Sequence, residues 1–219
     1  IEAATVARWD ADADRLLAEA MAAAPDVIEV PLPSSLSATA LTSLAEDPEG
    51  FAAALARPMP RQPSVAARFG TRFHAWVEAR FGQLGLFAPD DLPGQADAGI
   101  DDDQELLALC QAFEDGPFGD RAPLVLEHAF SLTLAGQVVR GRIDAVYAGD
   151  DPDHDFLVVD WKTGRRESAD PGQLALYRLA WAELTGTPLE RVRAAFYFVG
   201  SGVLMEPADL VDRTDLEQL

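Results

Sequence analysis

Three charged side chains in the second half of the chain have types and spacing that could hold a metal ion. Asp144 lies within the β-branched run of residues 138–147, and Asp160 and Lys162 end the apolar run that begins at Phe156. Side chains alternate along a strand, so Asp160 and Lys162 are expected on one face and Trp161 on the other. Two carboxylates at one sheet edge repel each other unless a cation lies between them, and Mg²⁺ binds through carboxylates and substrate phosphates. The spacing therefore predicts a metal-dependent site that cleaves phosphodiesters.

Lys162 is the only lysine of the chain, because the other sixteen basic residues are arginines. An ammonium is a compact charge whose pKa shifts on burial, and a guanidinium cannot replace it in that role. A sole lysine two residues after a strand-end aspartate therefore indicates chemistry. The alternative is an ordinary surface lysine, since Asp-x-Lys alone is a common tripeptide.

Length and composition limit the class of protein. The 219 residues, 48% of them apolar, predict one large domain or one domain with an appendage. No run is long enough to span a membrane, so we expect no membrane partner. The chain begins at Ile1 rather than Met, which suggests a piece of a longer protein. Cys110 is the only cysteine, which excludes an internal disulfide framework and a four-cysteine site, and weakly favours an intracellular setting.

The net charge of −20 argues against a free-standing nucleic-acid binder, because affinity for a phosphate backbone depends on cations. The acidity is uneven, and basic residues gather around the candidate site: Arg140, Arg142, Lys162, Arg165, Arg166 and Arg178. A locally basic rim on an acidic body can still engage phosphates. Most of the affinity for nucleic acid is then expected to come from a partner or from further domains.

Hydrophobic periodicity predicts helices separated by a group of strands. Helices are expected at residues 2–24, from Leu36 with Ser37 as cap, and at 48–56, 65–81, 102–113 and 171–184, the last capped by Asp170. Strands are expected at residues 27–30, in a meander of 124–134, 137–147 and 155–162, and at 192–199 and 203–205. Residues 82–101 are rich in Gly, Pro and Asp and predict an exposed loop. This order predicts an α/β layer fold.

A series of these residues resembles the RecB-like branch of the PD-(D/E)xK nuclease superfamily over about residues 64–205. The series runs His74, Glu127, Gly-Arg-Ile-Asp144, Asp160-Trp-Lys162 and Gln173-Leu-Ala-Leu-Tyr177, in the order of the family. The opening Leu-Ser-Ala-Thr-Ala-Leu also resembles the segment that introduces this module in RecB-, AddB- and AdnB-type proteins. The resemblance implies an α/β fold with a central mixed β-sheet flanked by helices. We expect residues 64–219 to form the nuclease core, with a helical and extended segment, 1–63, packed on it.

The resemblance also implies a role for each matched residue. His74, Asp144, Asp160 and the backbone carbonyl of Trp161 would bind the metal ion. Lys162, with Asp160 and Asp144, would form the catalytic set, and Lys162 would position or deprotonate the attacking water. Gln173 and Tyr177, four residues apart on one helix face, would contact the nucleic acid. Glu127 matches an acidic position of the family and is a possible accessory residue.

The expected cofactor is Mg²⁺ or Mn²⁺, since carboxylates suit both ions and an imidazole ligand is compatible with Mn²⁺. Some members of the family hold an iron–sulfur cluster with four cysteines, the first just before a proline of the opening segment. This chain has Asp47-Pro48 at that place and a single cysteine. We therefore expect no iron–sulfur cluster held by this chain.

Each matched residue also has an ordinary structural interpretation. A lone helical histidine such as His74 is usually structural, and Asp144 could cap the turn at residues 149–154. Tyr177 could belong to the core, and the Trp161 side chain is expected to pack. His128 and His154 lack support from the resemblance and are expected to have no function, and the acidic runs are expected to be solvated loops.

Together these observations predict a Mg²⁺- or Mn²⁺-dependent DNA exonuclease or endonuclease domain of a helicase–nuclease that processes double-strand breaks. The resemblance implies a single strand delivered by helicase domains of the same polypeptide. It also implies a second subunit as partner and a bacterial cytoplasmic location at the nucleoid. One alternative is a catalytically silent nuclease-fold scaffold or DNA guide, against which the intact Asp144, Asp160 and Lys162 argue. The other is a stand-alone nuclease, which would lack motor motifs upstream.

Overall fold

The computed structural model describes residues 2–21, 29–59, 65–82, 100–164, 167 and 169–218 and divides the chain into two units, 1–31 and 32–219. The first unit contains helix α1 (Glu2–Met21), which confirms the described part of the helix expected at residues 2–24. Its large apolar side chains, including Trp9, Leu16 and Met21, are exposed. The expected boundary between residues 63 and 64 lies outside the described residues.

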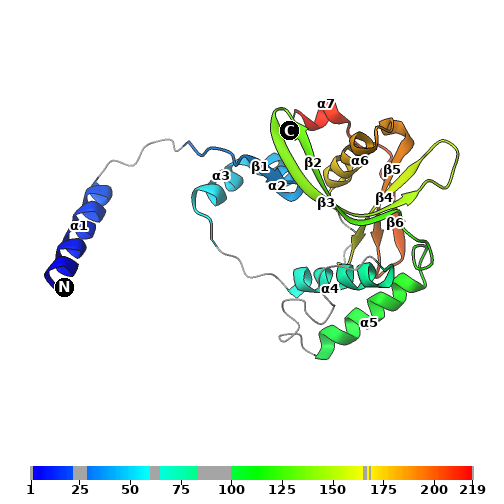
Figure 1. The fold of residues 1–219 in the computed structure, drawn as a ribbon, viewed down its shortest axis with the longest axis horizontal. Coiled ribbons are helices and arrows are strands. Elements are labelled where there is room, and N and C mark those ends of the chain that lie inside the picture. The colour runs from blue at the N-terminus through cyan, green and yellow to red at the C-terminus, as the bar shows by residue number, and fades with distance from the viewer. Residues whose placement is uncertain are drawn as a thin grey trace. The chain divides into compact units, whose positions relative to one another are not determined.

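The second unit is built on a mixed sheet in which β3 (Gln137–Ala148) pairs with three other strands (Figure 1). It pairs in parallel with β1 (Ser35–Ser37) and antiparallel with β2 (Val125–Leu134) and β4 (Phe156–Lys162). Beyond β4, β5 (Val192–Phe198) is parallel and β6 (Val203–Met205) antiparallel to its neighbour. The sequence-predicted meander and the two later strands are therefore confirmed.

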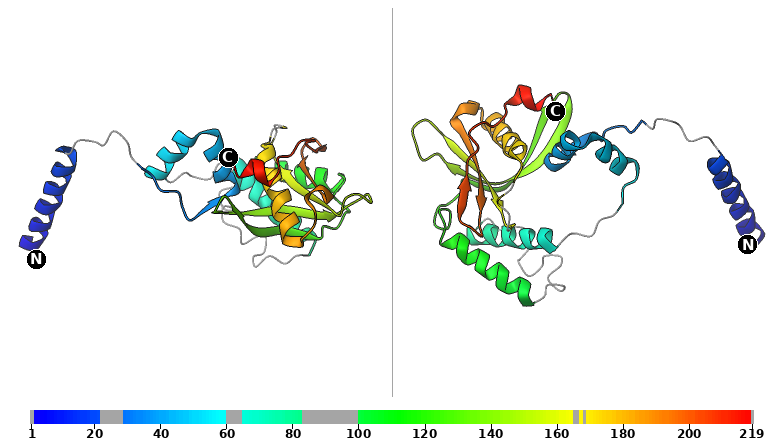
Figure 2. Two further views of the ribbon diagram at one scale, coloured as in Figure 1. Left: turned by 90° about the horizontal axis from the view of Figure 1, so that it is seen from above. Right: turned by 180° about the vertical axis from the view of Figure 1, so that it is seen from behind.

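Helices cover both faces of this sheet (Figures 1 and 2). Helix α6 (Pro171–Thr185) packs on one face in a core cluster that includes Val146, Val158 and Phe196. Helices α4 (Val65–Arg80) and α5 (Ile100–Glu114) pack on the other, in a cluster that includes Tyr147 and Trp161. The remaining helical elements are α2 (Ala38–Glu46), α3 (Pro48–Ala56), the 3₁₀ turn η3 (Leu189–Arg191) and α7 (Arg213–Leu216). The predicted central mixed sheet flanked by helices is confirmed.

Two helix starts that bear on the site follow directly from local sequence. The Asp170 side chain accepts a hydrogen bond from the Gly172 N–H, and Pro171 occupies the first position of α6, where no N–H is needed. Gly186 ends this helix in the left-handed conformation, with φ 67°. Ser37 caps α2 through the Ala40 N–H, as expected.

The alternation of side chains in the β2–β3 hairpin shifts by one residue at Glu127 and Asp144. On β3, Ile143 and Val146 face the α6 side while Ala145 faces the α4 side, so strict alternation fails at Asp144. The pairs Leu126–Ala145 and His128–Ile143 flank the irregularity, and Glu127 has φ 46°, which is unusual for a residue with a side chain. Two acidic side chains leave the hairpin at this irregular point.

The structure also departs from the sequence-based expectations. Strand β1 was not expected, because three residues directly before a helix carry no periodic signal. The strand expected at residues 27–30 is absent at residues 29 and 30, and the rest of it lies outside the described residues, as does nearly all of the loop expected at residues 82–101. No helix in the described ranges is long and apolar enough to cross a membrane.

Gly141 allows close packing beneath the site, and its substitution tests that packing. A Cβ at Gly141 would lie 2.6 Å from the Phe130 ring, which is buried. Gly141→Ala should therefore lower the free energy of unfolding by about 1–3 kcal/mol through overpacking, measured by urea denaturation. Gly200→Ala, whose Cβ would meet Leu109 at an ordinary 3.7 Å, is the matched control and should change stability by less than about 0.5 kcal/mol. Equal stability of both variants would contradict this account of Gly141.

Candidate functional site

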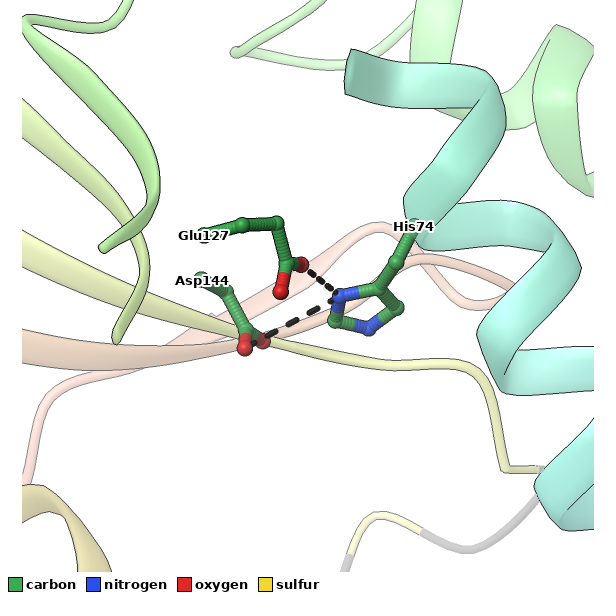
Figure 3. Close-up of side chains that lie close together, drawn as sticks. All are labelled: His74, Glu127 and Asp144. Carbon is green, nitrogen blue, oxygen red and sulfur yellow. Dashed lines mark hydrogen bonds and ion pairs between the residues drawn. The ribbon is translucent and has the colours of Figure 1, made fainter. Parts of the chain in front are cut away.

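His74, Glu127 and Asp144 converge from three different elements at the irregular point of the hairpin. Figure 3 shows His74 pointing from α4 toward Glu127 of β2 and Asp144 of β3. The His74 Nδ1 atom lies 2.5 Å from Glu127 Oε1 and 3.8 Å from Asp144 Oδ1. One potential ligand atom from each residue lies within 4.8 Å of the other two, so the three can hold one metal ion.

A second group of side chains, on β4 and α6, adjoins this cluster. Lys162 Nζ lies 2.8 Å from Asp160 Oδ2 and donates to Gln173 Oε1 at 2.9 Å. The Gln173 side-chain amide donates to Asp160 Oδ1 at 3.1 Å and lies 2.8 Å from the Tyr177 hydroxyl. Gln173 thus orients both the lysine and the aspartate, and the spacing of four residues along α6 brings Tyr177 into the same network.

The two groups are joined through the backbone of β4. The backbone N–H of Trp161 donates to Asp144 Oδ2 at 2.8 Å. The Trp161 indole ring packs against Phe73, Phe113 and the His74 ring. Asp160 and Lys162 face the α6 side and the indole faces the α4 side, as the alternation predicted. Trp161 therefore holds Asp144 through its backbone N–H and His74 through its indole ring.

Burial of the acidic groups makes their negative charges costly. Asp144 is 9% exposed and Asp160 is 2% exposed. Burial and the charge of Asp160 raise the pKa of Asp144 to about 8, although protonated His74 and the Trp161 N–H act in the opposite direction. Burial also raises the pKa of Asp160, and Lys162 opposes that rise. Burial lowers the pKa of His74, but the Glu127 hydrogen bond and the surrounding carboxylates outweigh it and raise the value to about 9.

The donor atoms fit a divalent cation. Asp160 Oδ2 is buried, and its charged neighbour is the Lys162 ammonium, 2.8 Å away. A carboxylate oxygen left in this state retains lone pairs for a cation. Carboxylates with one imidazole are ligands that suit Mn²⁺, and carboxylates alone suit Mg²⁺.

The cluster opens into a cleft of about 630 Å³ between α4, the start of α2 and strand β3. His74, Glu127, Asp144 and Tyr177 contribute to its wall. The further lining residues are Ser37, Ala38, Thr39, Gly70, Thr71, Ala75, Glu78, Arg140, Gly141 and Arg142. Arg142 Nη1 also lies 3.5 Å from Glu127 Oε2, so the positive charge of a guanidinium lies beside the acidic cluster.

The structure places the site residues named from the resemblance at this rim. Arg178, expected among the basic residues around the site, instead donates to the Val192 and Leu189 carbonyls at the other end of the sheet, and Arg165 and Arg166 lie outside the described residues. Glu127 is more central than expected, since it contacts both His74 and Arg142. Sequence reasoning missed the cleft-lining residues of α2, because their proximity depends on the unexpected strand β1. His128 packs against Trp181 and His154 lies beside Asp151, each away from the cluster.

Comparisons with known proteins define the class. The family model of the PD-(D/E)XK nuclease superfamily matches residues 35–218, and the chain belongs to that superfamily. A crystal structure from Eubacterium rectale, described as a "putative exonuclease", has the same fold, with a TM-score of 0.55 and 12% identity over 84% of this chain and 75% of that chain. A second structure, SSO0001, is 14% identical over 87% of this chain and 75% of that chain, with a TM-score of 0.36. No curated protein matches this chain.

Proton linkage at the acidic cluster predicts how pH changes stability. The folded state holds protons on Asp144 and His74 more tightly than the unfolded chain, whose ordinary pKa values are 3.8 and 6.5. The free energy that these protons contribute is complete below the unfolded values and is lost as pH rises toward about 8 for Asp144 and about 9 for His74. In a chelator, unfolding should therefore become easier as pH rises from about 4 to about 9, with both groups contributing above pH 6.5.

A divalent ion must displace the same protons, so its stabilising effect should grow with pH. We expect the increase in melting temperature caused by Mn²⁺, relative to EDTA, to be larger at about pH 8.5 than at about pH 6.5. Asp144→Asn should remove most of this increase at both pH values. An Mn²⁺ effect that is independent of pH, or that survives in Asp144→Asn, would contradict the assignment.

Proposed function

We propose that this domain is a Mg²⁺- or Mn²⁺-dependent deoxyribonuclease that hydrolyses phosphodiester bonds. The observation that carries the proposal is the cluster of His74 and Asp144, which line the cleft, beside the Asp160–Lys162 pair in a chain of the nuclease superfamily. His74, Asp144, Asp160 and the Trp161 carbonyl are proposed to hold the ion, with Glu127 beside them. When bound, the ion would neutralise phosphate charge and lower the pKa of a water molecule.

The side chains around the ion have separate tasks in this proposal. Lys162 positions the attacking water and stabilises negative charge that develops on the phosphate, because its ammonium is half-buried and fixed by Gln173. Glu127 orients the His74 ring through Nδ1, which leaves Nε2 available as a ligand. Gln173 and Tyr177 border the path of the nucleic acid and hold Asp160 and Lys162 in register.

The biological setting is proposed from the resemblance of particular segments. The series from His74 to Tyr177 and the opening segment at residues 36–41 are similar to those of RecB- and AdnB-type subunits. We therefore propose a helicase–nuclease that acts in break repair, with motor domains in the same polypeptide, a second subunit and a bacterial cytoplasmic location. The Eubacterium rectale structure with the same fold is described as that of a "putative exonuclease", which supports exonuclease activity. The net charge of −20 supports delivery of the strand by a partner.

Removal of the Asp160 charge tests the metal-dependent step. Asp160→Asn keeps the shape of the side chain and should lower the rate of single-stranded DNA cleavage in Mn²⁺ by about 10²–10⁴-fold, because the ion loses a charged ligand. Asp153→Asn makes the same change in the exposed turn before β4 and should leave the rate unchanged. Cleavage at equal rates by wild type and Asp160→Asn would refute the site, and absence of cleavage by wild type in Mn²⁺ would favour the silent scaffold.

Lys162→Arg tests whether charge alone is sufficient. The guanidinium is larger, and the ammonium now occupies a position between Asp160, Gln173 and the Phe196 ring. We expect the cleavage rate to fall by about tenfold or more while the melting temperature stays within a few degrees of wild type. A wild-type rate for this variant would show that any positive charge at this position supports the reaction.

A further inference from the structure

Two arginines lie on the same face of β3 as Asp144, next to the candidate active site. Val139 and Ile143 face the core on the α6 side, so alternation places Arg140 and Arg142 on the opposite face, toward the cleft. Asp144 is the next residue on that face and contacts His74 of α4. Positions 140, 142 and 144 therefore form a row that ends at the acidic cluster.

Arg140 differs from several other arginines of this acidic chain, which have carboxylate partners. Arg72, Arg80, Arg191, Arg193 and Arg213 each make an ion pair with at least one carboxylate. Within the described ranges, by contrast, no carboxylate pairs with Arg140, which is exposed and lines the cleft. Arg142 has one long contact, of 3.5 Å, with Glu127. An uncompensated guanidinium beside a nuclease site is suited to bind an anion.

The start of α2 adds further donors at the same end of the row. The register of β1 and β3 places Ser37 opposite Arg140, and Ser37, Ala38 and Thr39 line the same cleft. The first turn of α2 has no acidic residue, and the Ser37 side chain caps the Ala40 N–H. The N–H groups at the start of a helix have no partners within the helix and favour negative charge.

We propose that Arg142 and Arg140, assisted by the start of α2, bind successive backbone phosphates of a single DNA strand that leads away from the scissile bond. Residues two apart on a strand are about 6.5–7 Å apart, which is close to the spacing of neighbouring phosphates in an extended single strand. Arg140 is a substrate-binding residue that holds the strand and takes no part in bond cleavage. The inference rests on the proposed nuclease function and adds the direction in which the substrate crosses the protein.

The test measures binding of a fluorescein-labelled oligodeoxythymidylate by anisotropy in EDTA, over a series of salt concentrations. Each phosphate contact to a single strand contributes about −0.7 to the slope of log K against log salt. Arg140→Ala should weaken binding by about threefold to tenfold at low salt and reduce the slope by about 0.7, and the Arg140→Ala/Arg142→Ala double variant should reduce it by about 1.4. Arg140→Lys should retain the wild-type slope.

Arg191→Ala provides the matched control, because it removes the same charge at the opposite end of β4, where Arg191 pairs with Asp155. It should leave the slope at the wild-type value. An unchanged slope in Arg140→Ala, equal effects of Arg140→Ala and Arg191→Ala, or no binding by wild type at low salt would each overturn the inference. Binding involves no cleavage, so a wild type that binds with the expected slopes but does not cleave in Mn²⁺ would contradict the proposed function and still support the phosphate row.

Discussion

Two carboxylates almost withdrawn from water at one rim of the sheet constrain the rest of this domain. A buried carboxylate is unstable unless it is protonated, paired or bound to a cation. The chain compensates Asp160 with Lys162 and Gln173, and it compensates Asp144 with the Trp161 N–H and with His74. The compensation is incomplete, since burial still raises the pKa of both carboxylates, that of Asp144 to about 8. A divalent ion would complete it.

The scaffold explains how these groups are held so closely. The left-handed backbone at Glu127 costs about 1–3 kcal/mol and occurs where the hairpin changes its alternation, directly opposite Asp144. This irregularity turns the Glu127 carboxylate toward α4, where the His74 ring is fixed by edge contacts with Phe73 and Trp161. The energy for this local strain comes from the two core clusters on either side of the sheet.

Much of the fold could be predicted from periodicity, because the strands of the meander and the helix after Asp170 carry strong local signals. Strand β1 could not be, since its three residues obtain their pairing from β3, about a hundred positions away in the sequence. The junction of His74 with Glu127, fifty-three positions apart, likewise has no local signal and was expected only from resemblance. The shift at Glu127 and Asp144 also escaped prediction, because strict alternation was assumed through the site.

The central claim is that the rim binds one divalent cation, and anomalous diffraction locates such an ion directly. Crystals grown with MnCl₂ and measured near the manganese absorption edge should show an anomalous peak in contact with His74, Asp144 and Asp160, close to the Trp161 carbonyl. The same experiment on Asp144→Asn should lose the peak. A wild-type map with no peak at this rim, or with manganese bound only elsewhere, would contradict the account.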